Sequence, residues 1–69
     1  MNTEIENWFS YHRPSAEDQA KYEEIRSKAK ELATVIADTC PPSADRTAAM
    51  RKLREAVMTA NASIACGGK

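Results

Sequence analysis

The chain has 69 residues, ten basic and ten acidic side chains, and 42% hydrophobic residues. This length leaves room for one domain, and so short a chain buries too small a fraction of its surface to be comfortably stable alone, so self-association is expected. The balanced charge excludes the strong positive field of a protein that coats duplex nucleic acid.

The first 14 residues form an arm, which is expected to be helical around residues 4–9. The next stretch contains no Gly or Pro and is rich in good helix formers, so it predicts one long helix over about residues 15–39. Ser15 is the expected N-cap of this helix. The Pro41-Pro42 pair ends it, because proline lacks an amide donor and restricts the residue before it.

A second helix is predicted over about residues 43–65, with Ser43 as its N-cap and Gly67-Gly68 as its C-terminal stop. The connection between the two long helices is short, and short connections give antiparallel neighbours. The sequence therefore predicts an all-α fold in which residues 1–69 form a single domain, an arm followed by an antiparallel two-helix hairpin.

Apolar side chains recur at steps of three and four along both long helices. One seam consists of Tyr22, Ile25, Ala29, Leu32 and Ile36, and the other of Met50, Leu53, Val57, Ala60 and Ile64. Two matched seams predict coiled-coil-like packing of the pair. Several apolar residues outside the seams have nothing in a two-helix hairpin to pack against, namely Ala33, Val35, Ala48, Ala49, Met58 and Ala62. They are candidate subunit contacts, and we expect a homo-oligomer.

No pattern of side chains indicates catalysis, a metal or a cofactor. His12 is the only histidine, and no nucleophile motif accompanies it. Cys40 and Cys66 belong to no CxxC pair and are expected to be structural thiols in a reducing cytosol. The N-terminus is acidic where a signal peptide is basic, and no apolar run approaches the length of a membrane span. We expect an intracellular protein that is not an enzyme and does not enter a membrane.

Three of the four aromatic residues, Trp8, Phe9 and Tyr11, fall within four positions, and His12 and Arg13 follow at once. Trp8 and Phe9 are interpreted as apolar residues that fold the arm back onto the hairpin. Tyr11 precedes two polar residues and a proline, so it is an amphipathic ring on a turn. For Tyr11, stacking on a nucleotide base and packing within the fold are equally open alternatives.

Basic side chains of the long helix divide between two faces at about 100° per residue. Arg26 and Lys30 share one face, whereas Lys28 and Lys21 border the other side of the seam. Arg26 and Lys28 therefore either serve two sites or converge on one site from different subunits. Lys21 and Lys30 are interpreted as solubilising charges. Glu24 and Lys28 have the i,i+4 spacing of a helix ion pair.

Asn61 lies in the run ANASIA, one step past the seam position Ala60, with almost no polar company. A polar amide among small residues usually has a hydrogen-bond partner. The alternatives are an interhelical or intersubunit hydrogen bond and recognition of a base edge.

Four blocks in order, IENWFSYH, IRSKAKELATVI, CPPS and LREAVMTANASIA, resemble the helical hairpin domain shared by the phage anti-CBASS protein 2 and the Thoeris anti-defence protein 1. The likeness spans about Ile5 to Ala65. It implies a non-enzymatic sponge that sequesters cyclic oligonucleotide immune signals, without cleaving them, in the cytoplasm of the infected bacterial host. It also implies a homo-oligomer, which is hexameric in the anti-CBASS branch.

The resemblance implies site residues as well. In the anti-CBASS branch, cyclic dinucleotides lie between protomers, where a tyrosine of the arm stacks on a base and a basic residue of the long helix meets phosphate. These roles map to Tyr11 and Arg26, and an arginine would meet phosphate with a planar fork where some members use lysine. Some members hold cyclic trinucleotides at a second intersubunit site, for which Lys28 is a candidate and Asn61 a weaker one.

Trp8 and His12, which flank Tyr11 in the sequence, complete the set of candidate ligand-binding residues. The Thoeris branch captures cyclic ADP-ribose isomers and has additional sequence before the hairpin, so this chain resembles the shorter anti-CBASS type more closely. Capture of cyclic ADP-ribose signals is one alternative function. Another is a structural or regulatory hairpin that binds a protein through its alanine-rich faces.

Overall fold

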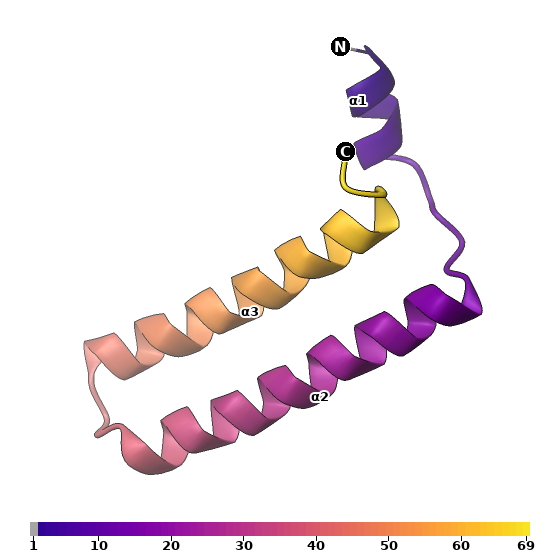
Figure 1. The fold of residues 1–69 in the computed structure, drawn as a ribbon. Coiled ribbons are helices and arrows are strands. Elements are labelled where there is room, and N and C mark those ends of the chain that lie inside the picture. Colours follow the sequence, from indigo (N-terminus) through magenta and orange to yellow (C-terminus); the bar gives the residue numbers. More distant parts are fainter. Residues whose placement is uncertain (1) are drawn as a thin grey trace.

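The computed structural model describes residues 2–69, and residue 1 of the predicted arm lies outside the described residues. Over this range the chain forms three helices and no strand: α1 (Asn2–Trp8), α2 (Ala16–Thr39) and α3 (Ala44–Ala65). The all-α prediction is confirmed. The helices α2 and α3 run side by side in opposite directions, and α1 lies beyond the C-terminal end of α3 (Figure 1).

Polar side chains define both ends of α2. Ser15 is the N-cap, as expected: its Oγ accepts from the backbone N–H of Asp18 at 3.1 Å, and its own N–H donates to Asp18 Oδ2 at 3.4 Å. This reciprocal pair satisfies two amide donors that have no partner within the helix. At the other end, Arg46 Nη1 donates to the carbonyls of Ala37 and Cys40, at 3.3 and 3.4 Å. A cation beside these carbonyls also interacts favourably with the negative end of the helix dipole.

Capping also explains the bounds of α3. Ser43 Oγ accepts from the backbone N–H of Arg46 at 3.1 Å, which confirms it as the N-cap. At the C-terminus, Gly67 and Gly68 have φ values of 67° and 78°. The N–H of Gly68 donates to the carbonyl of Ser63 at 2.8 Å. This left-handed reversal suits glycine because glycine has no Cβ, and it ends α3 as the sequence predicts.

The two long helices meet along a half-buried stripe. On α2 the stripe consists of Tyr22, Ile25, Ala29, Ala33 and Ile36, and on α3 of Met50, Leu53, Val57, Ala60 and Ile64. One seam position was predicted wrongly. Leu32 is 49% exposed, and Ala33, expected outside the seam, takes its place. A strict alternation of three and four fits 3.5 residues per turn, and a helix of 3.6 residues per turn drifts away from it.

The single chain is a thin, open plate rather than a compact body. Its extents are 44 × 28 × 15 Å and its radius of gyration is 15.0 Å, against about 11 Å for a compact domain of this length. No residue in the range 3–69 is fully buried. The chain exposes 5721 Å², whereas a compact monomer of 7.6 kDa exposes about 4,300 Å². The excess of about 1,400 Å² is larger than the share that one partner buries in a standard interface, about 800 Å².

Candidate functional site

The C-terminal end of α1 is closed by groups from the segment that follows it. The N–H of Phe9 donates to the carbonyl of Ile5 at 3.1 Å, and the hydroxyl of Ser10 donates to the carbonyl of the next residue of α1. His12 Nε2 lies 2.5 Å from the carbonyl oxygen of Asn7. The last carbonyls of a helix have no partner within it, so these three bonds satisfy three successive acceptors.

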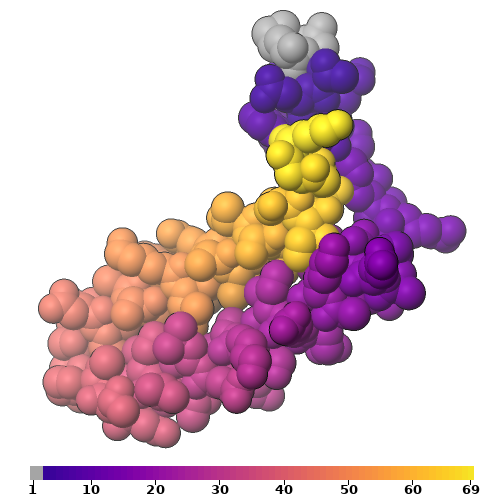
Figure 2. Space-filling model, viewed as in Figure 1, coloured from indigo at the N-terminus to yellow at the C-terminus, as the bar shows by residue number. Residues whose placement is uncertain are grey.

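The end of α1 is also attached to the C-terminus of α3 by a set of contacts that we call the clasp. Asn7 Nδ2 donates to the carbonyl of Cys66 at 3.2 Å, and Trp8 Nε1 donates to the carbonyl of Lys69 at 2.9 Å. Cys66 Sγ also lies 3.8 Å from the carbonyl of Asn7. In Figure 2 the C-terminal residues lie directly against α1. The position of the arm is therefore set by the end of α3.

This arrangement corrects one prediction for the aromatic cluster. Phe9 was expected to pack onto the hairpin, and it is 82% exposed. Asn7 faces α3, and a residue two positions later points about 200° around the helix, so Phe9 lies on the opposite side. Trp8 does anchor the arm, but through its indole N–H, and the residue remains 52% exposed.

Tyr11 lies in the segment between α1 and α2 and is 84% exposed. Its two neighbours, Ser10 and His12, both hydrogen-bond to carbonyls of α1. Four residues further along, Ser15 starts the capping box of α2. The ring is therefore not used for packing within its own chain, although the backbone on both sides of it is tied down.

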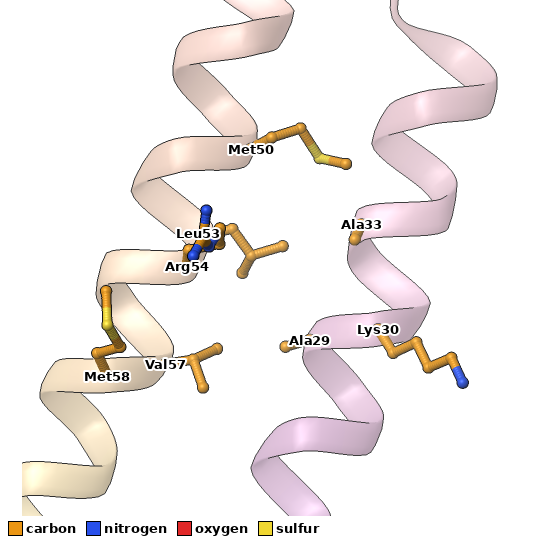
Figure 3. Close-up of a pocket in the computed structure, with 8 residues that line it drawn as sticks. All are labelled: Ala29, Lys30, Ala33, Met50, Leu53, Arg54, Val57 and Met58. Carbon is orange, nitrogen blue, oxygen red and sulfur yellow. The ribbon is translucent and has the colours of Figure 1, made fainter.

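The stripe between α2 and α3 opens into a groove on each face of the plate. Figure 3 shows the first, which we call the Lys30 groove, where Val57 and Leu53 point across at Ala29 and Ala33. Because these two α2 side chains are small, the groove stays open, with a volume of about 390 Å³. Its lining is completed by Lys30, Met50, Arg54 and Met58.

The opposite face carries the Lys28 groove, which has a volume of about 430 Å³ and is lined in part by Lys28, Leu32 and Ala56. Lys30 and Lys28 thus lie on different faces of the plate, as the angular argument requires. The expected ion pair of Lys28 with Glu24 does not form. Lys28 Nζ instead lies 3.4 Å from Glu31 Oε2, one turn in the other direction.

Arg26 lies one turn before Lys30 and therefore borders the same face of α2. Its Nη1 donates to Glu23 Oε1 at 2.7 Å, and the two side chains are 66% and 72% exposed. An exposed pair of this kind contributes only about 0–1 kcal/mol. The guanidinium can therefore exchange Glu23 for a phosphate at little cost.

Asn61 is half-buried, and its Oδ1 is a buried acceptor that receives no hydrogen bond from residues 2–69. Since Val57 faces Ala29 in the antiparallel pair, the residue four positions further along α3 lies level with Ile25, beside Arg26. An unsatisfied buried acceptor costs about 1–3 kcal/mol. The oxygen itself is not exposed, so a donor from outside the chain can reach it only when the Asn61 side chain turns outward.

The candidate residues do not converge within one chain. Tyr11, Trp8 and His12 belong to the arm and its connector, Arg26 and Asn61 border one face of the hairpin, and Lys28 borders the other. The described part of the chain, residues 2–69, contains no cluster of three His, Cys, Asp or Glu side chains able to hold a metal ion. None of its helices is long and apolar enough to span a membrane.

Sequence reasoning missed the two polar groups that place the arm, Asn7 and Cys66. They are 59 residues apart in the chain, and neither belongs to a recognisable motif. It also missed the bonds of Ser10 and His12 to α1. A Ser and a His within four or five residues of a helix end are the signal that could have suggested them.

The family model described as Acb2/Tad1, hairpin domain, matches residues 1–65, a range that includes all three helices. The chain belongs to the Acb2/Tad1 hairpin-domain family. The resemblance drawn from the four sequence blocks is thereby confirmed. Membership supports a phage anti-defence role as a binding sponge rather than as an enzyme. No curated protein and no solved structure matches the chain.

Proposed function

We propose that this Acb2/Tad1 hairpin domain is a sponge for cyclic oligonucleotide immune signals, which it binds intact in the cytoplasm of the infected host. Cyclic dinucleotides are the first candidate ligands. The observation that carries the proposal is Tyr11: a ring that is 84% exposed on a backbone held at both neighbouring residues. An exposed aromatic ring on a tethered backbone is a platform on which a base can stack.

Arg26 supplies the second chemical element of the proposed site. A guanidinium offers phosphate a planar fork of donors, and the weak pair with Glu23 leaves it available. Asn61, level with Arg26 on the same face, would accept an N–H from a base edge or from a neighbouring copy once its side chain turns outward and exposes Oδ1. These groups supply stacking, charge and one acceptor, which together match a cyclic nucleotide.

Self-association is part of the proposal, because the groups are spread over different parts of the plate. The excess exposed area of about 1,400 Å² supports extensive contacts between copies. Exposed apolar side chains that such contacts would cover include Leu32, Val35 and Met58. We propose a homo-oligomer, with a hexamer as the expected form, in which Tyr11 of one copy meets Arg26 of another.

A second site on the Lys28 face is proposed for cyclic trinucleotides. Lys28 borders a groove on the opposite side of the plate from Lys30, so it cannot share a small anion with Arg26 of the same chain. Its ammonium lies near Glu31, in an exposed pair as weak as that of Arg26.

Calorimetric titration with a panel of cyclic di- and trinucleotides and cyclic ADP-ribose isomers tests the proposal. Tyr11→Ala should weaken cyclic dinucleotide binding by about 5- to 150-fold, the equivalent of one lost stack of 1–3 kcal/mol. Tyr11→Phe keeps the ring and should retain most of the affinity. Arg26→Ala should weaken binding by about ten-fold or more, whereas Arg51→Ala, an exposed arginine of α3, should have no effect.

Two matched variants test where the phosphate binds. Glu23→Gln removes the carboxylate that holds Arg26, and Glu31→Gln makes the same charge change beside Lys28. If a phosphate of the dinucleotide binds Arg26, Glu23→Gln should tighten binding by about two- to five-fold, and Glu31→Gln should not. Equal effects of both variants would mean that only overall charge matters and would contradict the assignment to Arg26.

The absence of heat with every member of the panel would overturn the proposed function. Heat with cyclic ADP-ribose isomers alone would change the proposed ligand class but leave the proposed sponge function in place. The competing function, a hairpin that binds another protein through its alanine-rich faces, predicts that Tyr11→Ala and Arg26→Ala are both silent in every nucleotide titration.

A further inference from the structure

We propose that His12 and Ser10 are positioning residues for Tyr11: they do not touch the ligand, and they fix the ring by capping the C-terminal carbonyls of α1. This inference rests on the proposed function of Tyr11. His12 binds the carbonyl of Asn7 and Ser10 binds the carbonyl of Glu6, and Tyr11 is the one residue between them.

The geometry fixes the direction of the His12 bond. A carbonyl oxygen can only accept, so Nε2 of His12 must carry the proton, which leaves Nδ1 without one in the neutral ring. The bond closes a loop from Asn7 to His12, and Asn7 is itself held to the carbonyl of Cys66 at 3.2 Å. The end of α3 is therefore linked to the backbone of Tyr11 through two hydrogen bonds.

This linkage matters because an exposed side chain on a loose segment loses conformational freedom when it binds. Ordering a side chain and its loop at an interface opposes binding. With Ser10 and His12 bonded to α1, the backbone on both sides of Tyr11 is already ordered before the ligand arrives. The bonds of Ser10 and His12 to α1 therefore restrict the backbone on both sides of Tyr11, although the ring itself is 84% exposed.

A double-mutant cycle on the full chain separates positioning from contact. His12→Ala should weaken cyclic dinucleotide binding about five-fold, the equivalent of one ordinary hydrogen bond. His12→Gln, which keeps an N–H donor of similar reach, should restore most of the loss. In the Tyr11→Ala background, His12→Ala should have no further effect, because a residue that acts only through Tyr11 has nothing left to position. Arg26→Ala and His12→Ala should be additive.

Ser10→Ala provides a second cycle with the same expected pattern, should His12→Ala alter the oligomer mass. The chain has one histidine, so the nitrogen spectrum of its imidazole identifies the tautomer directly and without ligand. In the wild-type protein, Nε2 should carry the proton of the neutral His12 imidazole, and the Nε2–H resonance should be protected from exchange with water.

Additive losses for His12 and Tyr11 would show direct ligand contact by His12 and overturn the inference, as would unchanged affinity in both His12→Ala and Ser10→Ala. A neutral ring protonated at Nδ1 would also overturn it. In all three cases the wild type still binds cyclic dinucleotide, so the proposed function survives. Failure of the wild type to bind any nucleotide removes the proposed function and this inference together.

Discussion

The substitution Asn61→Ala should change the stability of the isolated chain and the stability of the assembly in opposite directions. In the single chain its Oδ1 is buried without a donor, at a cost of about 1–3 kcal/mol. Asn61→Ala removes that acceptor and replaces asparagine by a better helix former, worth about 0.6 kcal/mol more. The free chain should therefore become more stable by about 1.5–3.5 kcal/mol.

The assembly should respond in the other direction if a neighbouring copy supplies the missing donor. Asn61→Ala then deletes an intermolecular hydrogen bond and leaves the donor of the other copy unpaired, which raises the dissociation constant about ten-fold or more. Urea unfolding and sedimentation over a range of protein concentrations measure both effects, because the stability of an oligomer depends on concentration. Ser63→Ala, at an exposed position of the same helix, should leave the dissociation constant unchanged and raise stability only by the difference in helix propensity, about 0.5 kcal/mol.

Loss of ligand affinity with unchanged assembly would assign the donor to the nucleotide. The reasoning is refuted if Asn61→Ala leaves both assembly and ligand binding as tight as in the wild type. That result would mean that the orphaned oxygen of Asn61 has no partner in any functional state.

The remaining predictions concern the ends of α2. Ser15→Ala should lower the free energy of unfolding by about 1 kcal/mol because it removes the capping box, whereas Ser27→Ala, in the exposed middle of the helix, should be neutral or stabilising in the same urea titration. Arg46→Ala should lower the free energy of unfolding by up to about 1 kcal/mol at low salt, because it removes a positive charge from the last carbonyls of α2. The loss should be smaller at high salt, where this charge is screened, and equal losses at both salt concentrations would contradict the prediction.

Local chemistry made most of the fold predictable. Ser15 and Ser43 cap their helices, proline follows the end of α2 and glycine follows the end of α3, and each of these signals acts within a few residues. The seam was predictable except at Leu32, where the strict heptad spacing departs from the natural turn of a helix.

The placement of the arm was not predictable, because its contacts join residues about 60 positions apart. These contacts are single hydrogen bonds from side chains to backbone carbonyls near the C-terminus, Asn7 to Cys66 and Trp8 to Lys69. No periodicity in the sequence predicts them. Phe9 illustrates the consequence: hydrophobicity suggested burial, but the direction in which α1 is attached decides that this ring faces outward. Of the candidate site, the separation of the Lys28 face from the Lys30 face followed from helix angles alone.

Native mass spectrometry of the purified protein with a cyclic dinucleotide tests the central claim most directly, because it weighs the assembly and its ligand together. The account predicts a multiple of the 7.6 kDa chain that carries cyclic dinucleotide at its intact mass, and that loses it in the Tyr11→Ala variant. A monomer without ligand would contradict the claim that sites form between copies. Ligand released with the mass of one added water would contradict the claim that the protein binds without cleaving.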